Sequence, residues 1–290
     1  MSGAGTAPPE QARPAGAPAF PRTQSRWAGF VPSFVFGPIA LIGGFTELGL
    51  KVLGSAIRRP LGYWAAVRDE MYGVLKVSWF PITTAVFTFG LMIGILGLNF
   101  TTLLGAGNRY GQYFFIINIR EFTPWINSMV VAGIVGAAIC SDLGSRKVRE
   151  ELDALEVLGT DPVRELVLPR IVSVTVLTPL LMIVSVLIGV ICAVVSSVTY
   201  GHVPPGEYFA TVYANLTVVE IVFALVKSTV IGFVIGIVCS YMGLNASGGA
   251  AGVGLAVNRA VVIAFALVFV IDLIINLIAL GLFPAMQTVR

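Results

Sequence analysis

The chain has 290 residues with a net charge of +3; 57% of them are hydrophobic and only 11% are charged, and the mean hydropathy is +0.91. This composition excludes a water-soluble globular domain, and the long continuous apolar runs exclude a β-barrel, in which apolar and polar residues alternate. We therefore expect an all-α, polytopic membrane protein.

The N-terminal region divides into two parts before the first long apolar run. Residues 1–26 are rich in Pro, Ala and Gly and lack helical periodicity, which predicts a disordered cytoplasmic tail. Residues 27–76 are expected to form interfacial amphipathic helices. Within them, 27–46 carry about twenty uncharged residues and could span the membrane, but basic residues flank this stretch on both sides, which favours an interfacial or re-entrant helix.

A five-span permease domain is predicted over 77–282. Its first four spans are expected at 77–100, 122–141, 171–198 and 218–241, and the fifth at 260–282. Fourteen of the 18 Lys and Arg residues fall on one side of this topology, which predicts a cytoplasmic N-terminus. The loops at 101–121 and 199–216 and the C-terminal residues 283–290 are then extracytoplasmic.

The cytoplasmic connection between the second and third spans contains a predicted amphipathic helix, SRKVREELDALEVLG at 145–159. Val148, Leu152 and Leu155 recur at helical spacing and would share one face. Opposite charges four residues apart would support this helix. These pairs are Arg146 with Glu150, Lys147 with Glu151, and Arg149 with Asp153.

The helix at 145–159 is followed at once by signals for a second helix. Gly159 is a natural residue for ending a helix, and Thr160 or Asp161 can cap a new one that has Pro162 in its first turn. A short charged helix joined so tightly to a span could transmit force from a cytoplasmic motor. The alternative is a helix whose charges merely keep a loop in water.

Three charged residues fall within the apolar spans: Glu220 and Lys227 in the fourth and Asp272 in the fifth. Charges at membrane depth are costly, so they are usually paired or functional. A buried ion pair between Lys227 and Asp272 is one interpretation. Contact with a lipid headgroup is the other.

Two stretches of this sequence resemble a known family. The stretch GAAICSDLGSRKVREELDALEVLGTDP, 136–162, resembles the signature of the MlaE/YrbE permeases, the membrane subunits of MCE-type lipid ABC transporters. The stretch YMGLNASGGAAGVGLAVNRAVV, 241–262, resembles the second block of that family. The resemblance covers about residues 40–282 and is closest to the actinobacterial YrbE branch. Ser141 departs from the family pattern in the CSDLG sequence at 140–144, for which a structural role is expected.

The resemblance implies a transport subunit of the plasma (inner) membrane. Its implied partners are a cytoplasmic ABC ATPase, MCE-domain proteins, membrane lipids as substrate, and a second YrbE/MlaE permease, either a different paralogue or a second copy. In the family the helix between the second and third spans docks on the ATPase. By position, the residues of this coupling helix are Arg149, Glu150, Glu151, Leu152, Asp153, Ala154, Leu155 and Glu156.

Other functions find less support in the sequence. No G-x-x-x-x-G-K-[ST] motif occurs, so ATP would be hydrolysed by a separate chain and this one is expected to be non-catalytic. No metal or cofactor site is expected, since there is one histidine and the three cysteines lack metal-type spacing. Nucleic acid is not expected as a partner either. An ion-driven secondary transporter, a membrane enzyme acting on lipids and a scaffold of an envelope complex are the alternatives.

Overall fold

The computed structural model describes residues 33–58 and 62–283, and it contains no strand in these ranges, which confirms the all-α class. The predicted tail at 1–26 lies outside the described residues, as do 284–290 of the predicted C-terminal segment. The elements are α1 (Ser33–Arg58), α2 (Trp64–Leu103), η1 (Gly107–Arg109), α3 (Tyr110–Ile117), η2 (Asn118–Phe122), α4 (Thr123–Val130), η3 (Val131–Gly136), α5 (Ala137–Val148), α6 (Glu151–Val157), η4 (Val163–Val167), α7 (Leu168–Gly201), α8 (Pro205–Asn215), α9 (Val218–Leu244) and α10 (Gly249–Leu282).

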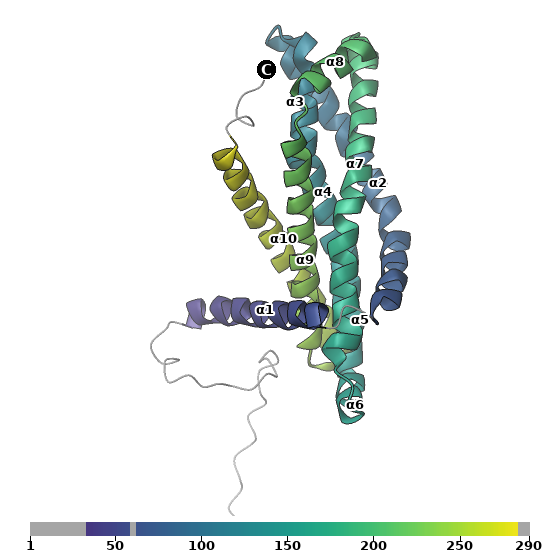
Figure 1. Cartoon of the computed structure of the whole chain (residues 1–290), viewed down its shortest axis with the longest axis vertical. Coiled ribbons are helices and arrows are strands. Elements are labelled where there is room, and N and C mark those ends of the chain that lie inside the picture. The colour runs from purple at the N-terminus through teal and green to yellow at the C-terminus, as the bar shows by residue number, and fades with distance from the viewer. Residues whose placement is uncertain (1–32, 59–61, 284–290) are drawn as a thin grey trace, which may run out of the picture.

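Six helical segments of the described chain are long and apolar enough to cross a membrane, and α1 is the shortest of them. Figure 1 shows α1 lying across the lower end of the molecule, whereas α2, α7 and α9 run along its length. A helix that crosses the others in this way cannot share their direction through a bilayer. Its orientation fits the predicted interfacial placement, which stays a prediction.

The structure corrects the predicted boundary between the interfacial region and the first span. Residues 64–76 belong to α2, which continues through the span predicted at 77–100 and ends at Leu103. The break in the chain comes earlier, where Gly62 has a φ of +121° that side chains rarely adopt. The charged residues of 64–76 therefore form the first turns of a spanning helix.

The two segments predicted as outer loops are largely helical. The second helical span runs from Gly107 to Val148 and includes η2, α4 and η3, so it begins well before the predicted residue 122. Within 199–216, α8 packs on α3 and buries Tyr208 against Tyr110. Figure 1 shows α3 and α8 together at the end of the molecule opposite α6.

The fifth span also begins earlier than predicted. Gly248 and Gly249 both have positive φ, and α10 starts directly at Gly249 rather than near residue 260. Of the 18 residues in the most apolar part of α10, only 11% are buried inside the chain. This is the smallest buried share among the six segments. α10 therefore packs on α9 and α5 along one side and leaves about half of its residues exposed on the other.

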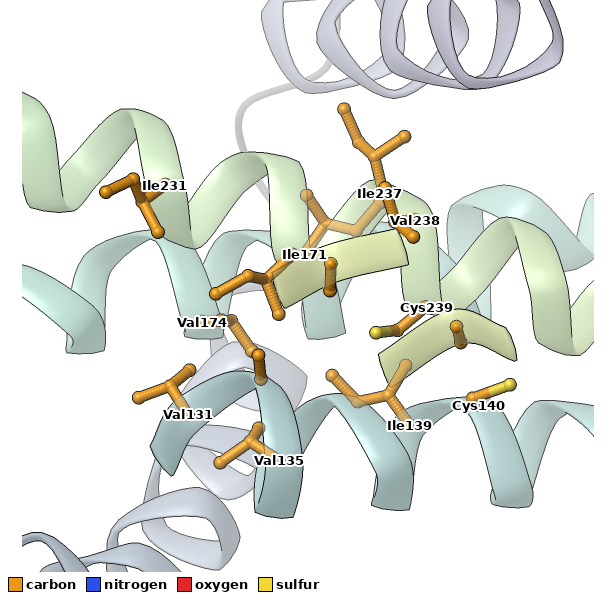
Figure 2. Close-up of a cluster of buried hydrophobic side chains, with 14 of the residues drawn as sticks. Val131, Val135, Ile139, Cys140, Ile171, Val174, Ile231, Ile237, Val238 and Cys239 are labelled. Atoms are coloured by element: carbon orange, nitrogen blue, oxygen red, sulfur yellow. The ribbon is translucent and has the colours of Figure 1, made fainter. Parts of the chain in front are cut away.

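The core is built where η3, α5, α7 and α9 meet. Figure 2 shows Ile171 and Val174 of α7 among the aliphatic side chains of the neighbouring helices. All three cysteines are free and buried, as expected for cysteines that pack like small apolar residues. Close approach of the helices depends on small residues, since a Cβ at Gly136 would lie 2.7 Å from Cys239 Sγ.

Candidate functional site: the α5–α6 connection and the polar cluster

The predicted helix at 145–159 is divided in two in the structure. α5 ends at Val148, and α6 runs from Glu151 to Val157. Between them Glu150 has a φ of 60°, in the left-handed region. The prediction of a single helix was wrong because periodicity does not register one residue of left-handed backbone. We call residues 145–159 the coupling segment, after the role that the sequence resemblance predicts for them.

This break also changes the predicted ion pairs. Lys147 Nζ lies 2.7 Å from Asp153 Oδ1, six residues along the chain, and Arg149 Nε lies 2.9 Å from Glu151 Oε1. Arg146 pairs instead with Asp142, 3.1 Å away within α5. The i, i+4 spacing requires an unbroken helix, so none of the three predicted pairs forms: Lys147 and Arg149 pair across the turn, and Arg146 pairs mainly within α5.

The end of the coupling segment follows its local sequence. Gly159 has a φ of +77°, its N–H donates to the Glu156 carbonyl, and the Thr160 N–H donates to the Leu155 carbonyl. This is the Schellman pattern of a glycine-terminated helix. Asp161 then accepts a hydrogen bond from the Val163 N–H at 3.0 Å and so caps the next helix.

The residues of α6 divide into one that packs inward and a set that stays accessible. Leu152 is buried. Leu155 and Glu151 are half-buried, and the remaining residues of the predicted coupling helix are exposed: Arg149, Glu150, Asp153, Ala154 and Glu156. Just beyond them Val157 and Leu158 are 88% and 77% exposed, and sequence periodicity did not single them out. The outer face of α6 therefore combines carboxylates with an apolar tip.

A groove of about 1030 Å³ separates α6 from α1. Its α1 wall includes Lys51 and Arg58, and its opposite wall includes Glu156 and Arg164. The end of α9 closes it through Tyr241, on whose ring Phe45 of α1 packs edge-on. Helix α1 and the coupling segment therefore lie on opposite sides of this charged groove.

A second set of charged groups lies between η2, α9 and α10. Its members, which we call the polar cluster, are Arg120, Glu121, Glu220, Lys227, Asp272 and Asn276. Glu220 is buried, and both of its carboxylate oxygens accept hydrogen bonds from the Arg120 guanidinium, with Nε to Oε2 at 2.6 Å. Such two-point pairs hold their partners in one orientation.

Lys227 occupies the centre of the polar cluster. Its side chain is 2% exposed, and Nζ lies 2.9 Å from Asp272 Oδ1, so the ion pair considered from the sequence is present. Nζ also donates to the Arg120 carbonyl and, at 3.0 Å, to Asn276 Oδ1. The Lys227 ammonium is therefore paired with one carboxylate and donates to two further oxygens, all three on two other elements.

Sequence reasoning missed half of this cluster. Arg120 and Glu121 were placed in an outer loop, because two adjacent charges normally end an apolar run. Asn276 was passed over as an uncharged residue, yet its Nδ2 donates to Glu121 at 2.6 Å and to Asp272 at 3.1 Å. The available signal was the spacing of Asp272 and Asn276, which places them on one face of a helix.

Residues 140–144 lie within α5 and pack against the residues at the start of α10. Leu143 and Cys140 are completely buried, and a Cβ at Gly144 would lie 3.2 Å from the side chains of Ala246 and Val253. Ser141 is exposed, so the departure at that position falls outside the packed face. The expected structural role of this stretch agrees with these contacts.

The chain matches known proteins over most of its length. A family model described as Permease MlaE matches residues 67–278. A probable ABC transporter permease protein of Rickettsia typhi is 28% identical over 202 residues, covering 70% of this chain and 78% of the relative. A probable ABC transporter permease protein of Synechocystis is 34% identical over 164 residues, covering 54% of this chain and 62% of the relative. The chloroplastic protein TRIGALACTOSYLDIACYLGLYCEROL 1 of Arabidopsis thaliana is 32% identical over 149 residues, covering 51% and 42%. Together with the all-helical architecture, the family match establishes that this chain is a multi-pass membrane protein that belongs to the MlaE permease family.

Proposed function

We propose that this chain is the transmembrane subunit of an ABC-type lipid transporter, in which a separate ATPase docks on the coupling segment and drives lipid between the membrane and an MCE-protein conduit. The observation that carries the proposal is the exposed face of α6. This short helix is joined to α7 by a turn of only a few residues, in which Gly159 ends α6 and Asp161 caps the next helix. A surface of this kind can receive a partner and move a spanning helix with it. Membership of a family of ABC transporter permeases supports the same conclusion.

Docking of the ATPase is supported by the chemistry of α6. Val157 and Leu158 are exposed apolar side chains at the extremity of the molecule, where Figure 1 shows α6 as the lowest labelled helix. Exposed apolar residues rimmed by charge are typical of protein interfaces. The carboxylates of Asp153 and Glu156 would orient a basic partner surface and speed its association.

A lipid substrate is proposed on two grounds. The Arabidopsis relative is named after a glycolipid, trigalactosyldiacylglycerol. The polar cluster, in turn, offers a charged centre flanked by the largely exposed helix α10. For Glu220, Lys227 and Asp272 we propose a primary role in holding η2, α9 and α10 together, because each already has a charged partner within the chain. A lipid headgroup would contact the more exposed rim at Glu121.

The proposed arrangement in the cell follows from the charge distribution. The chain lies in the plasma (inner) membrane with α1 and α6 on the cytoplasmic side and α8 on the other. A second permease pairs with this one, and if the chain belongs to the actinobacterial YrbE branch, that partner is a different paralogue. The poorly buried α10 offers an apolar surface for such pairing.

Purification of the native complex tests this function. We expect an ATPase to co-purify, and Leu158→Glu to weaken its binding by about 30-fold or more, the loss typical of an interface hot spot. Leu104→Glu is the matched control, because Leu104 is 66% exposed between α2 and α3, away from α6. The proposal fails if the complex contains no ATPase, or if Leu158→Glu leaves both ATPase binding and ATP-dependent lipid transfer unchanged.

A further inference from the structure

A continuous chain of charged side chains leads from the coupling segment into the helical bundle. Arg146 Nη1 lies 3.6 Å from Glu151 Oε2 of α6, and Arg146 Nε lies 3.1 Å from Asp142 Oδ2. The same Asp142 oxygen is 2.5 Å from Arg170 Nη2 of α7, and Arg170 Nε is 3.2 Å from Glu70 Oε1 of α2. These five groups, which we call the charged chain, therefore join α6, α5, α7 and α2.

Arg170 is the link of this chain that is most removed from solvent. Its side chain is 8% exposed, whereas the carboxylates of Asp142 and Glu70 are 42% and 39% exposed. The planar guanidinium points different nitrogen atoms at the two acids, one on each neighbouring helix. An ammonium group carries the same charge but lacks this fixed fork, so lysine cannot hold both acids in the same geometry.

The backbone connection after α6 leads only into α7, through Gly159 and Asp161. The charged chain adds α2 and the base of α5 to the elements that a displaced coupling segment would pull. It consists of ion pairs that can be exchanged, and the Nη1 of Arg170 is a buried donor with no partner among the described residues. A network with a spare donor can adopt a second set of pairs without losing all of its bonds.

We infer that Arg170 is a positioning residue that carries movement of the coupling segment to α2 and α7 together. This inference rests on the proposed function, since it needs an ATPase that moves α6. It identifies a role for one residue that the resemblance does not assign. Glu70 and Asp142 are its two acceptors, and Arg146 connects it to α6.

The test compares Arg170→Lys and Glu70→Gln in the complex with its ATPase, reconstituted in lipid vesicles. The readout is the amount of lipid moved per ATP hydrolysed, measured beside ATPase association and thermal stability. In Arg170→Lys we expect association and ATP hydrolysis to persist while this ratio falls about fivefold or more, within the usual range of coupling between sites. Glu70→Gln removes only the link to α2 and is expected to give a smaller fall.

Arg68→Lys is the matched control, because it makes the same change in an exposed ion pair with Asp69 on α2. An unchanged ratio in both test variants overturns the role of Arg170. If Arg170→Lys does not assemble, Glu70→Gln decides alone, since its side chain is accessible and its loss leaves the Asp142 pair intact. A wild-type complex that hydrolyses ATP without moving lipid refutes the proposed function itself, and the role of Arg170 with it.

Discussion

Removing the charge of Lys227 tests how the polar cluster stabilises the fold. The Lys227 and Asp272 side chains are 2% and 13% exposed, so neither can be rehydrated when its partner is lost. Lys227→Met therefore leaves a carboxylate uncompensated, and we expect the free energy of unfolding to fall by about 3–5 kcal/mol. Lys227→Met together with Asp272→Asn removes both charges, and we expect it to be less damaging than Lys227→Met alone.

The matched control for this prediction is Lys51→Met. Lys51 Nζ lies 2.7 Å from Glu47 Oε1, about as close as in the buried pair, but the two side chains are 56% and 63% exposed. Solvent screening limits such a pair to about 0–1 kcal/mol. The measurement is unfolding by sodium dodecyl sulfate in mixed micelles, followed by tryptophan fluorescence. Equal losses for Lys227→Met and Lys51→Met would refute the reasoning that burial sets the magnitude.

Three further predictions concern packing, the coupling segment and the cysteines. Gly94→Leu should lower the unfolding free energy by about 1–3 kcal/mol in the same titration, because a Cβ there would lie 2.7 Å from Ser196 Oγ, whereas Gly54→Leu, with open space around it, should cost less. Gly159→Ala should cost about 1–2 kcal/mol because its φ is +77°, and no loss would contradict the observed helix end. A maleimide should label no cysteine in the folded protein and all of them after unfolding, as read by mass spectrometry, and rapid labelling of the folded protein would contradict their burial. These cysteines are Cys140, Cys192 and Cys239.

Local chemistry made some features predictable from the sequence. Apolar runs located the spans because the requirement to cross a bilayer acts on each segment alone. The positive φ of Gly159 and the cap by Asp161 were readable because both effects involve only neighbouring residues. The predicted start of the fourth span at Val218 coincides with the start of α9, because the apolar run itself begins there.

Features that depend on distant residues were not predictable in this way. Arg120 lies inside a helical span because Glu220, a hundred positions away, neutralises it. Arg170 was counted only as a cytoplasmic cation, since nothing near it in the sequence indicates that Glu70 and Asp142 converge on it. The left-handed backbone of Glu150 likewise has no local sequence signal, because glycine is the residue that usually marks such a turn.

The link between α6 and α7 has a mechanical consequence. From Gly159 to Val163 the backbone is held by hydrogen bonds to both helices, and Pro162 fixes one further torsion. A slack linker transmits tension only, whereas a stiff one resists compression as well. In the proposed transporter, approach of the ATPases would therefore push α7 and their separation would pull it, so that both halves of a nucleotide cycle act on the same spanning helix.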